Sequence, residues 1–116
     1  MMDIRQKTAP FEFDGKVFQL TCNMNVLAEV QEIYDGAISK ALVGKGTLRA
    51  VNAFLTAMLN DYADSQGWIE RYDIKTVGRM LDSTPAAMTA RNTLVMGLVT
   101  AAFTPAEGSR EEPEKN

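Results

Sequence analysis

Apolar and polar residues alternate near the beginning of the chain, on both sides of the pair Asp14-Gly15. Alternation over a few residues is typical of a strand with one buried face, and an Asp-Gly pair between two such runs is typical of a tight hairpin turn. The apolar residues that frame this turn are Phe11, Phe13, Val17 and Leu20. We therefore expect a short β-hairpin, which must pack on the rest of the chain because a two-stranded ribbon is only marginally stable alone.

After the hairpin the apolar spacing changes to steps of three and four, which is typical of amphipathic helices. Either Asn23 or Asn25 can cap the first helix by accepting a backbone N–H, and Gly36 is suited to its end. A short helical turn is expected over residues 37–43, before two closely spaced glycines.

The longest helix is predicted to begin at Thr47, as its N-cap, and to end at Gly67. Its apolar stripe consists of Leu48, Val51, Phe54, Leu55, Met58, Leu59 and Tyr62. The opposite face, which we expect to lie in solvent, carries Arg49, Asn52, Thr56, Asn60 and Asp64. Trp68 and Ile69 are expected to fold back onto the core.

Two further helices follow. Asp73 can cap a shorter one, and Thr84 followed by Pro85 is typical of the start of another, which should run to about Phe103. The predicted fold class is therefore α+β but mostly α, with an N-terminal β-hairpin packed on a bundle of about four helices.

The chain of 116 residues is long enough for one domain with its own core. We expect a flexible N-terminal arm over residues 1–8 and a single helical domain with its hairpin over residues 9–103. Residues 104–116 form an acidic stretch without an apolar anchor. Such a stretch cannot offset the entropy lost on ordering, so a disordered tail is expected.

The last predicted helix is unusual because no charged residue occurs between Arg91 and Glu107. At 100° per residue, its apolar side chains cover considerably more than half of the circumference. Either this helix runs through the centre of the fold, or a partner covers part of it. The candidate partner-binding residues are Met80, Met88, Leu94, Val95, Met96, Val99 and Phe103.

The composition limits the chemistry. The chain has no histidine and a single cysteine, Cys22, so one copy cannot assemble a Cys–His nucleophile pair or an ordinary structural zinc site. Cys22 ends an apolar alternation and is interpreted as a small core residue. The carboxylate pairs Glu29/Glu32 and Asp61/Asp64 are interpreted as solvated surface charge. We therefore expect no catalytic, cofactor or metal site, and no enzyme.

Nucleic acid and membrane partners are not expected. The net charge of −3 counts against a nucleic-acid binder, although Val77 to Pro85 imitates the start of a helix-turn-helix. Only Arg91 is basic in the would-be recognition helix, which leaves too few phosphate contacts. The longest nearly apolar run, 94–103, is about half of what a membrane span needs.

The order of these segments resembles a known family. The hairpin FEFDGKVF at residues 11–18 is followed by NMN at 23–25, where a helix opens that ends with Tyr34-Asp35-Gly36. The long helix then carries FLTAMLNDY at residues 54–62 and is followed by Gly67-Trp68. This arrangement is similar to the tail assembly chaperones of long-tailed phages and prophages, over roughly residues 9–103.

The resemblance implies a function in virion assembly. Such chaperones bind the tape-measure protein, help to gather tail tube proteins around it, and leave before the tail is complete; some form homo-oligomers. It also implies a place in the host bacterial cytoplasm and absence from the mature virion. The alternatives are a structural tail or head–tail joining protein that stays in the particle, and a small helix-turn-helix regulator.

Overall fold

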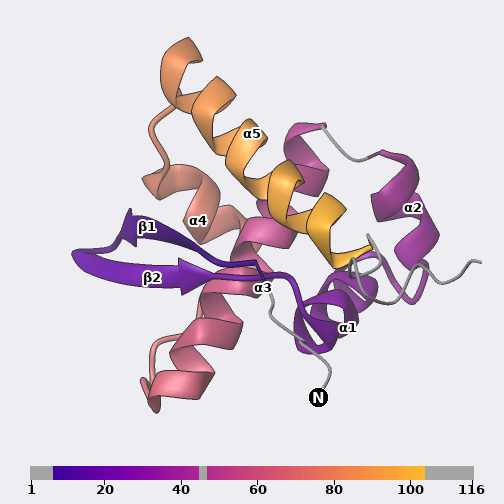
Figure 1. The fold of residues 1–116 in the computed structure, drawn as a ribbon, viewed down its shortest axis with the longest axis horizontal. Coiled ribbons are helices and arrows are strands. Elements are labelled where there is room, and N and C mark those ends of the chain that lie inside the picture. The colour runs from indigo at the N-terminus through magenta and orange to yellow at the C-terminus, as the bar shows by residue number, and fades with distance from the viewer. Residues whose placement is uncertain (1–6, 45–46, 104–116) are drawn as a thin grey trace, which may run out of the picture.

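The computed structural model describes residues 7–44 and 47–103 of the chain. Figure 1 shows an N-terminal β-hairpin followed by helices, which confirms the predicted fold class. The strands are β1 (Ala9–Phe13) and β2 (Lys16–Leu20), and the helices are α1 (Met24–Ile33), α2 (Ile38–Val43), α3 (Leu48–Gln66), α4 (Ile74–Met80) and α5 (Pro85–Ala102). The predicted acidic tail and most of the predicted N-terminal arm lie outside the described residues.

The hairpin turn forms as the Asp-Gly pair indicated. Both turn residues have positive φ, 55° at Asp14 and 70° at Gly15, as a two-residue turn between twisted antiparallel strands requires. The register pairs Phe13 with Lys16 and Phe11 with Phe18. Phe18 is therefore the inward-facing aromatic residue of β2, and its neighbour Val17 is exposed.

Each of the helices α1, α3, α4 and α5 begins with a capping side chain that accepts the N–H of the residue three positions later, which offsets one orphan donor of the first turn. The caps are Asn23, Thr47, Asp73 and Thr84. Asn25, the alternative cap of α1, lies inside that helix. These predictions from the sequence are confirmed.

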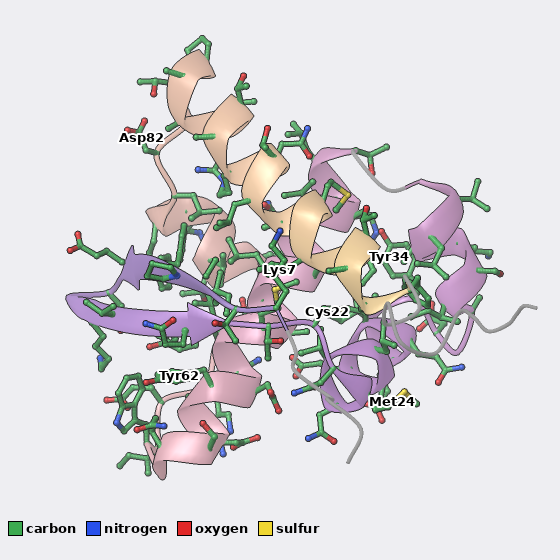
Figure 2. The ribbon with its side chains drawn as sticks, viewed as in Figure 1. Lys7, Cys22, Met24, Tyr34, Tyr62 and Asp82 are labelled. Carbon is green, nitrogen blue, oxygen red and sulfur yellow. The ribbon has the colours of Figure 1, made fainter. Side chains whose placement is uncertain are left out.

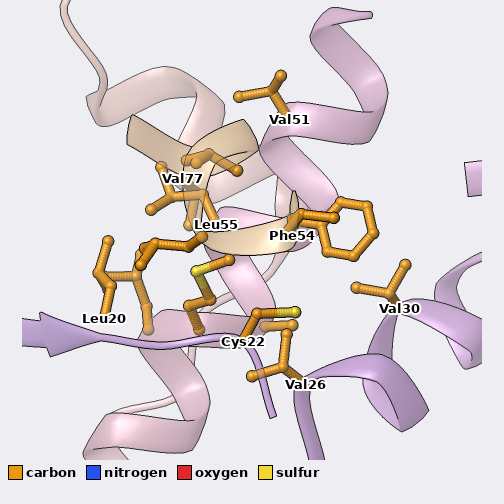
Figure 3. Packing of buried hydrophobic residues seen from close by; sticks show 14 of the residues in the cluster. Leu20, Cys22, Val26, Val30, Val51, Phe54, Leu55 and Val77 are labelled. Atoms are coloured by element: carbon orange, nitrogen blue, oxygen red, sulfur yellow. The ribbon is translucent and has the colours of Figure 1, made fainter. Parts of the chain in front are cut away.

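Helix α3 is the centre of the fold, with β2, α1, α4 and α5 packed around it. Its residues are buried without interruption from Ala53 to Asn60, so the helix is enclosed on all sides there. The prediction of a solvated face is therefore wrong at Thr56 and Asn60, which are 1% and 7% exposed. Figure 3 shows how side chains from β2, α1 and α4 meet those of α3 in this core.

Cys22 belongs to this core, as the sequence predicted. Burial raises the pKa of its thiol to about 11. The thiol therefore stays protonated at neutral pH and behaves as a small apolar side chain.

An aromatic cluster joins the hairpin to the end of α3. Phe18 makes an edge-on contact with Trp68 at a centroid distance of 5.4 Å, and Tyr62 lies beside both rings. The predicted fold-back of Trp68 is thus confirmed. The same prediction is wrong for Ile69, which is 88% exposed.

Helix α5 differs between its two halves. The C-terminal half packs on α3 and buries Val95, Leu98 and Val99. The N-terminal half continues past α3 beside the connection from α4 and has no buried residue before Val95 (Figure 1). Among the described residues, none of the helices is both long and apolar enough to cross a bilayer.

Candidate docking groove

A largely apolar groove of about 580 Å³ lies between the hairpin, the end of α4 and the N-terminal half of α5. Its lining residues are Phe11, Glu12, Phe13, Asp14, Met80, Leu81, Asp82, Ala87, Ala90, Arg91 and Leu94. Asp82, labelled in Figure 2, marks the turn between α4 and α5 at one border of the groove.

The hairpin wall of the groove is formed by β1. Phe11 and Phe13 project from the same face of this strand because they are two residues apart, and their rings stack with centroids 6.3 Å apart. On the side away from the groove, the ring of Phe13 makes edge-on contacts with the rings of Phe18 and Tyr72. This wall therefore rests on the core.

The opposite wall is the N-terminal half of α5. Ala87, Ala90 and Leu94 are spaced by three and four residues, so they lie along one face of the helix. Leu94 packs against the core, whereas the two alanines present only a methyl group each. A second helix can approach such a surface closely.

The floor is formed where α4 ends. Leu81 is the C-cap residue of α4, has extended backbone angles and packs against the core. Met80 beside it is 45% exposed. Its flexible thioether can adapt to apolar surfaces of different shapes.

The charged side chains of the groove differ in whether they already have hydrogen-bond or ion-pair partners within the chain. The Asp14 carboxylate accepts a hydrogen bond from the Tyr72 hydroxyl at 3.1 Å and pairs with Lys16 at 3.4 Å. Arg91 donates to the backbone oxygen of Asp82 at 3.0 Å. Glu12 is exposed and has no hydrogen bond or ion pair with any residue that the structure describes.

No protein-family model, curated protein or solved structure matches this chain.

The candidate partner-binding residues are distributed over three environments. Met80 and Leu94 line the groove. Val95 and Val99 face the core with at most 1% exposure, so they offer no surface to a partner in this structure. Met96 is partly buried against the same core. Met88 is half-buried outside the groove lining. Phe103, 53% exposed, lies at the other end of α5.

Other groove residues were not predicted from the sequence. Phe11 was assigned only to the hairpin, and Ala87 and Ala90 carry no strong signal because alanine is common on every face of a helix. Their spacing relative to Leu94 could have indicated a second apolar stripe, distinct from the one that enters the core.

The two carboxylate pairs meet where α1 crosses α3. The prediction of solvated charge is wrong for Glu29, which is half-buried and accepts a hydrogen bond from the Asn60 amide at 2.7 Å. Burial, followed by the charges of Asp64, Glu32 and Asp61, raises the pKa of Glu29, while the Asn60 hydrogen bond opposes this rise.

The hydrogen bonds of Asp61 give this carboxylate a structural role. Its carboxylate accepts from the side-chain amides of Asn23 at 2.7 Å and Asn25 at 3.3 Å, which fixes the start of α1 on α3. Over residues 7–44 and 47–103, no group of three or more acidic or cysteine side chains is arranged to hold a metal ion.

The α4–α5 pair has the order of a helix-turn-helix. However, Arg91, the basic residue of α5 within the described range, turns back to the Asp82 carbonyl at the groove. The exposed half of α5 is otherwise uncharged, so it offers little for phosphate binding.

Proposed function

We propose that this protein is a tail assembly chaperone of a long-tailed phage or prophage, which binds the tape-measure protein in the host cytoplasm and helps to recruit tube subunits. The observation that carries the proposal is the largely apolar groove, whose β1 wall rests on the core through Phe13. The resemblance over residues 9–103 supplies the identity of the client.

The groove suits a helical client. An amphipathic helix binds such a groove by placing residues at i, i+3, i+4 and i+7 into it. Burial of apolar surface contributes about 25 cal/mol per Å², from which the costs of association must be subtracted. We expect a single groove to bind weakly, because only the surplus over these costs contributes to affinity.

Weak single contacts fit a chaperone that must later be removed. A tape-measure protein is long, so many copies of the chaperone can bind along one client. Avidity then arises only if the bound copies are also linked to each other, which a homo-oligomer would provide. Without such linkage, occupancy depends on the chaperone concentration alone.

Co-expression with the tape-measure protein of the same phage or prophage tests the proposal. We expect the wild-type chain to keep this client soluble and to co-purify with it. Ala90→Asp, which places a charge in the groove at an exposed position, should abolish both effects. Failure of the wild-type chain to solubilise or to bind the client would overturn the proposal.

Thr89→Asp is the matched control. Thr89 is the preceding residue of α5, is also exposed and does not line the groove. The same charge is added at nearly the same distance from the helix N-terminus, so its effect on the helix dipole is similar. This variant should solubilise the client as well as the wild type.

Mass spectrometry of purified particles separates a departing chaperone from a retained structural protein. The proposal predicts that the chain is absent from mature particles. Stoichiometric presence would instead assign it to the tail or to the head–tail joint.

A further inference from the structure

We infer that the groove selects an amphipathic helix with lysine or arginine residues along the border that faces β1. This inference rests on the proposed function and specifies the chemistry of the client segment. Three features of the groove support it: the blunted edge of β1, the spacing of small residues on α5, and the unequal distribution of charge.

The edge of β1 disfavours an added strand. Because the turn has two residues, Phe13 and Lys16 form a hydrogen-bonded pair, and the pairs then alternate along the ribbon. The backbone groups of Glu12 and Pro10 therefore point away from β2. Proline has no N–H, so the outer edge of β1 has a single backbone donor, at Glu12, and cannot support a regular ladder.

The α5 wall favours a helix. Ala87, Ala90 and Leu94 lie in one row, with the larger side chain at the end that meets the core. Rows of this kind fit between the side-chain ridges of a second helix, and interaxial distances near 8 Å require small residues at the contact. Across the groove, Phe11 and Met80 can contact the apolar face of the same helix.

The charges of the groove are predominantly negative. Glu12, Asp14 and Asp82 stand against Arg91 alone, which gives three carboxylates and one guanidinium. Arg91 and Asp82 lie together at the α5 side, where their charges oppose each other. Asp14 pairs with Lys16 at 3.4 Å, so among the described residues of the groove Glu12, on β1, is the carboxylate without a cationic partner. A cationic side chain of the client is therefore stabilised along that border.

Two synthetic helical peptides test the inference against the full-length protein. Both carry the same leucine and alanine stripe at i, i+3, i+4 and i+7; one has lysines along one border of the stripe, and the other has glutamates there. Binding is measured by fluorescence anisotropy at low and high salt. We expect the lysine peptide to bind about fivefold tighter at low salt, with the difference reduced at high salt.

Charge reversal in the protein locates the effect. Glu12→Lys should reverse the preference between the two peptides, and Ala90→Asp should weaken the binding of both. Glu32→Lys makes the same change of net charge on exposed surface of α1, outside the groove, and should preserve the wild-type preference. Glu12 and Glu32 are both exposed, so neither change should disturb folding.

The inference is overturned if neither peptide binds, if both bind equally, or if Glu12→Lys leaves the preference unchanged. These outcomes are distinct from failure of the proposed function. A client that is solubilised by the wild type and equally by Glu12→Lys would leave the chaperone assignment intact and remove only the charge selection.

Discussion

The side-chain amide of Asn60 pairs with the backbone of Tyr72 through two hydrogen bonds. Its Oδ1 accepts the Tyr72 N–H at 2.8 Å, and its Nδ2 donates to the Tyr72 carbonyl oxygen at 2.9 Å. The same Nδ2 donates to Glu29 of α1 at 2.7 Å. One buried side chain in the middle of α3 thus holds both α1 and the segment that leads into α4.

This pairing also positions a wall of the docking groove. The Tyr72 ring packs edge-on against Phe13 at a centroid distance of 5.6 Å, and its hydroxyl donates to Asp14. Asn60 therefore acts through Tyr72 on the hairpin residues that line the groove. The stability of the core and the shape of the groove are coupled at this point.

Replacing Asn60 by alanine should destabilise the fold by about 3 kcal/mol, because the partly buried N–H and C=O of Tyr72 would both lose their partner. Urea unfolding followed by circular dichroism measures this change. Asn25→Ala is the control: it removes a longer bond, 3.3 Å, made by an exposed side chain, and should cost less than about 1 kcal/mol. Equal losses in the two variants would contradict the role assigned to Asn60.

Thr56 lies one helical turn before Asn60, and its buried hydroxyl has no hydrogen-bond partner in the described structure. A buried polar group without a partner is costly. Thr56→Val keeps the shape and removes the hydroxyl, so it should stabilise the protein by about 1 kcal/mol in the same unfolding experiment. Thr56→Ala also removes a buried methyl group, which offsets the gain, and should be close to neutral. A less stable valine variant would show that the hydroxyl is satisfied.

The local features of the fold could be predicted from the sequence because each depends on few residues. A cap needs one side chain and one N–H a turn away, and the hairpin needs the Asp14-Gly15 pair. The environment of α3 could not be predicted in the same way. Helical periodicity identified its apolar face. Asn60, however, is buried because its side-chain amide is hydrogen-bonded to the backbone of Tyr72, and a backbone partner has no signature in the sequence.

The groove is less predictable for a related reason. Its walls come from the hairpin and from the α4–α5 region, which are distant in sequence, and their juxtaposition is a property of the tertiary structure. The uncharged last helix did indicate apolar surface beyond the needs of one face. The sequence could not show which residues enter the core, so Val95 and Val99 were grouped with Leu94 although they face α3.

Tyr72 should make the protein less stable at alkaline pH. Burial, followed by the hydrogen bond to Asp14 and the charge of that carboxylate, raises the pKa of this phenol to about 12, above the value of 10.0 for a free tyrosine. The folded state therefore holds the phenolic proton more tightly than the unfolded state, so stability is retained below pH 10 and falls between about pH 10 and 12.

Absorbance at 295 nm across an alkaline titration follows the tyrosinates directly. One phenol should ionise near pH 12 in the wild type, and Asp14→Asn should lower that pKa because the neighbouring negative charge is removed. Tyr72→Phe should eliminate this late step. A late step that persists in Tyr72→Phe would assign it to another tyrosine.

Glu29 should limit stability at neutral pH. Its pKa is raised above the value of 4.5 for a free glutamate, first by burial and then by Asp64, Glu32 and Asp61. The folded state therefore binds this proton more tightly than the unfolded state, and the stabilisation that this gives is lost as pH rises through the folded pKa. Glu29→Gln removes the charge, while its amide oxygen can still accept from Asn60.

We expect Glu29→Gln to unfold at a higher urea concentration than the wild type at pH 7. The gain should shrink towards pH 4, as the wild-type carboxyl takes up its proton in the unfolded state as well as in the folded state. Glu12→Gln makes the same charge change on an exposed strand away from the acidic cluster, and should alter the midpoint little at either pH. If the urea midpoints of the two variants shift equally at pH 7, the effect comes from net charge, and the charged form of Glu29 does not itself destabilise the fold.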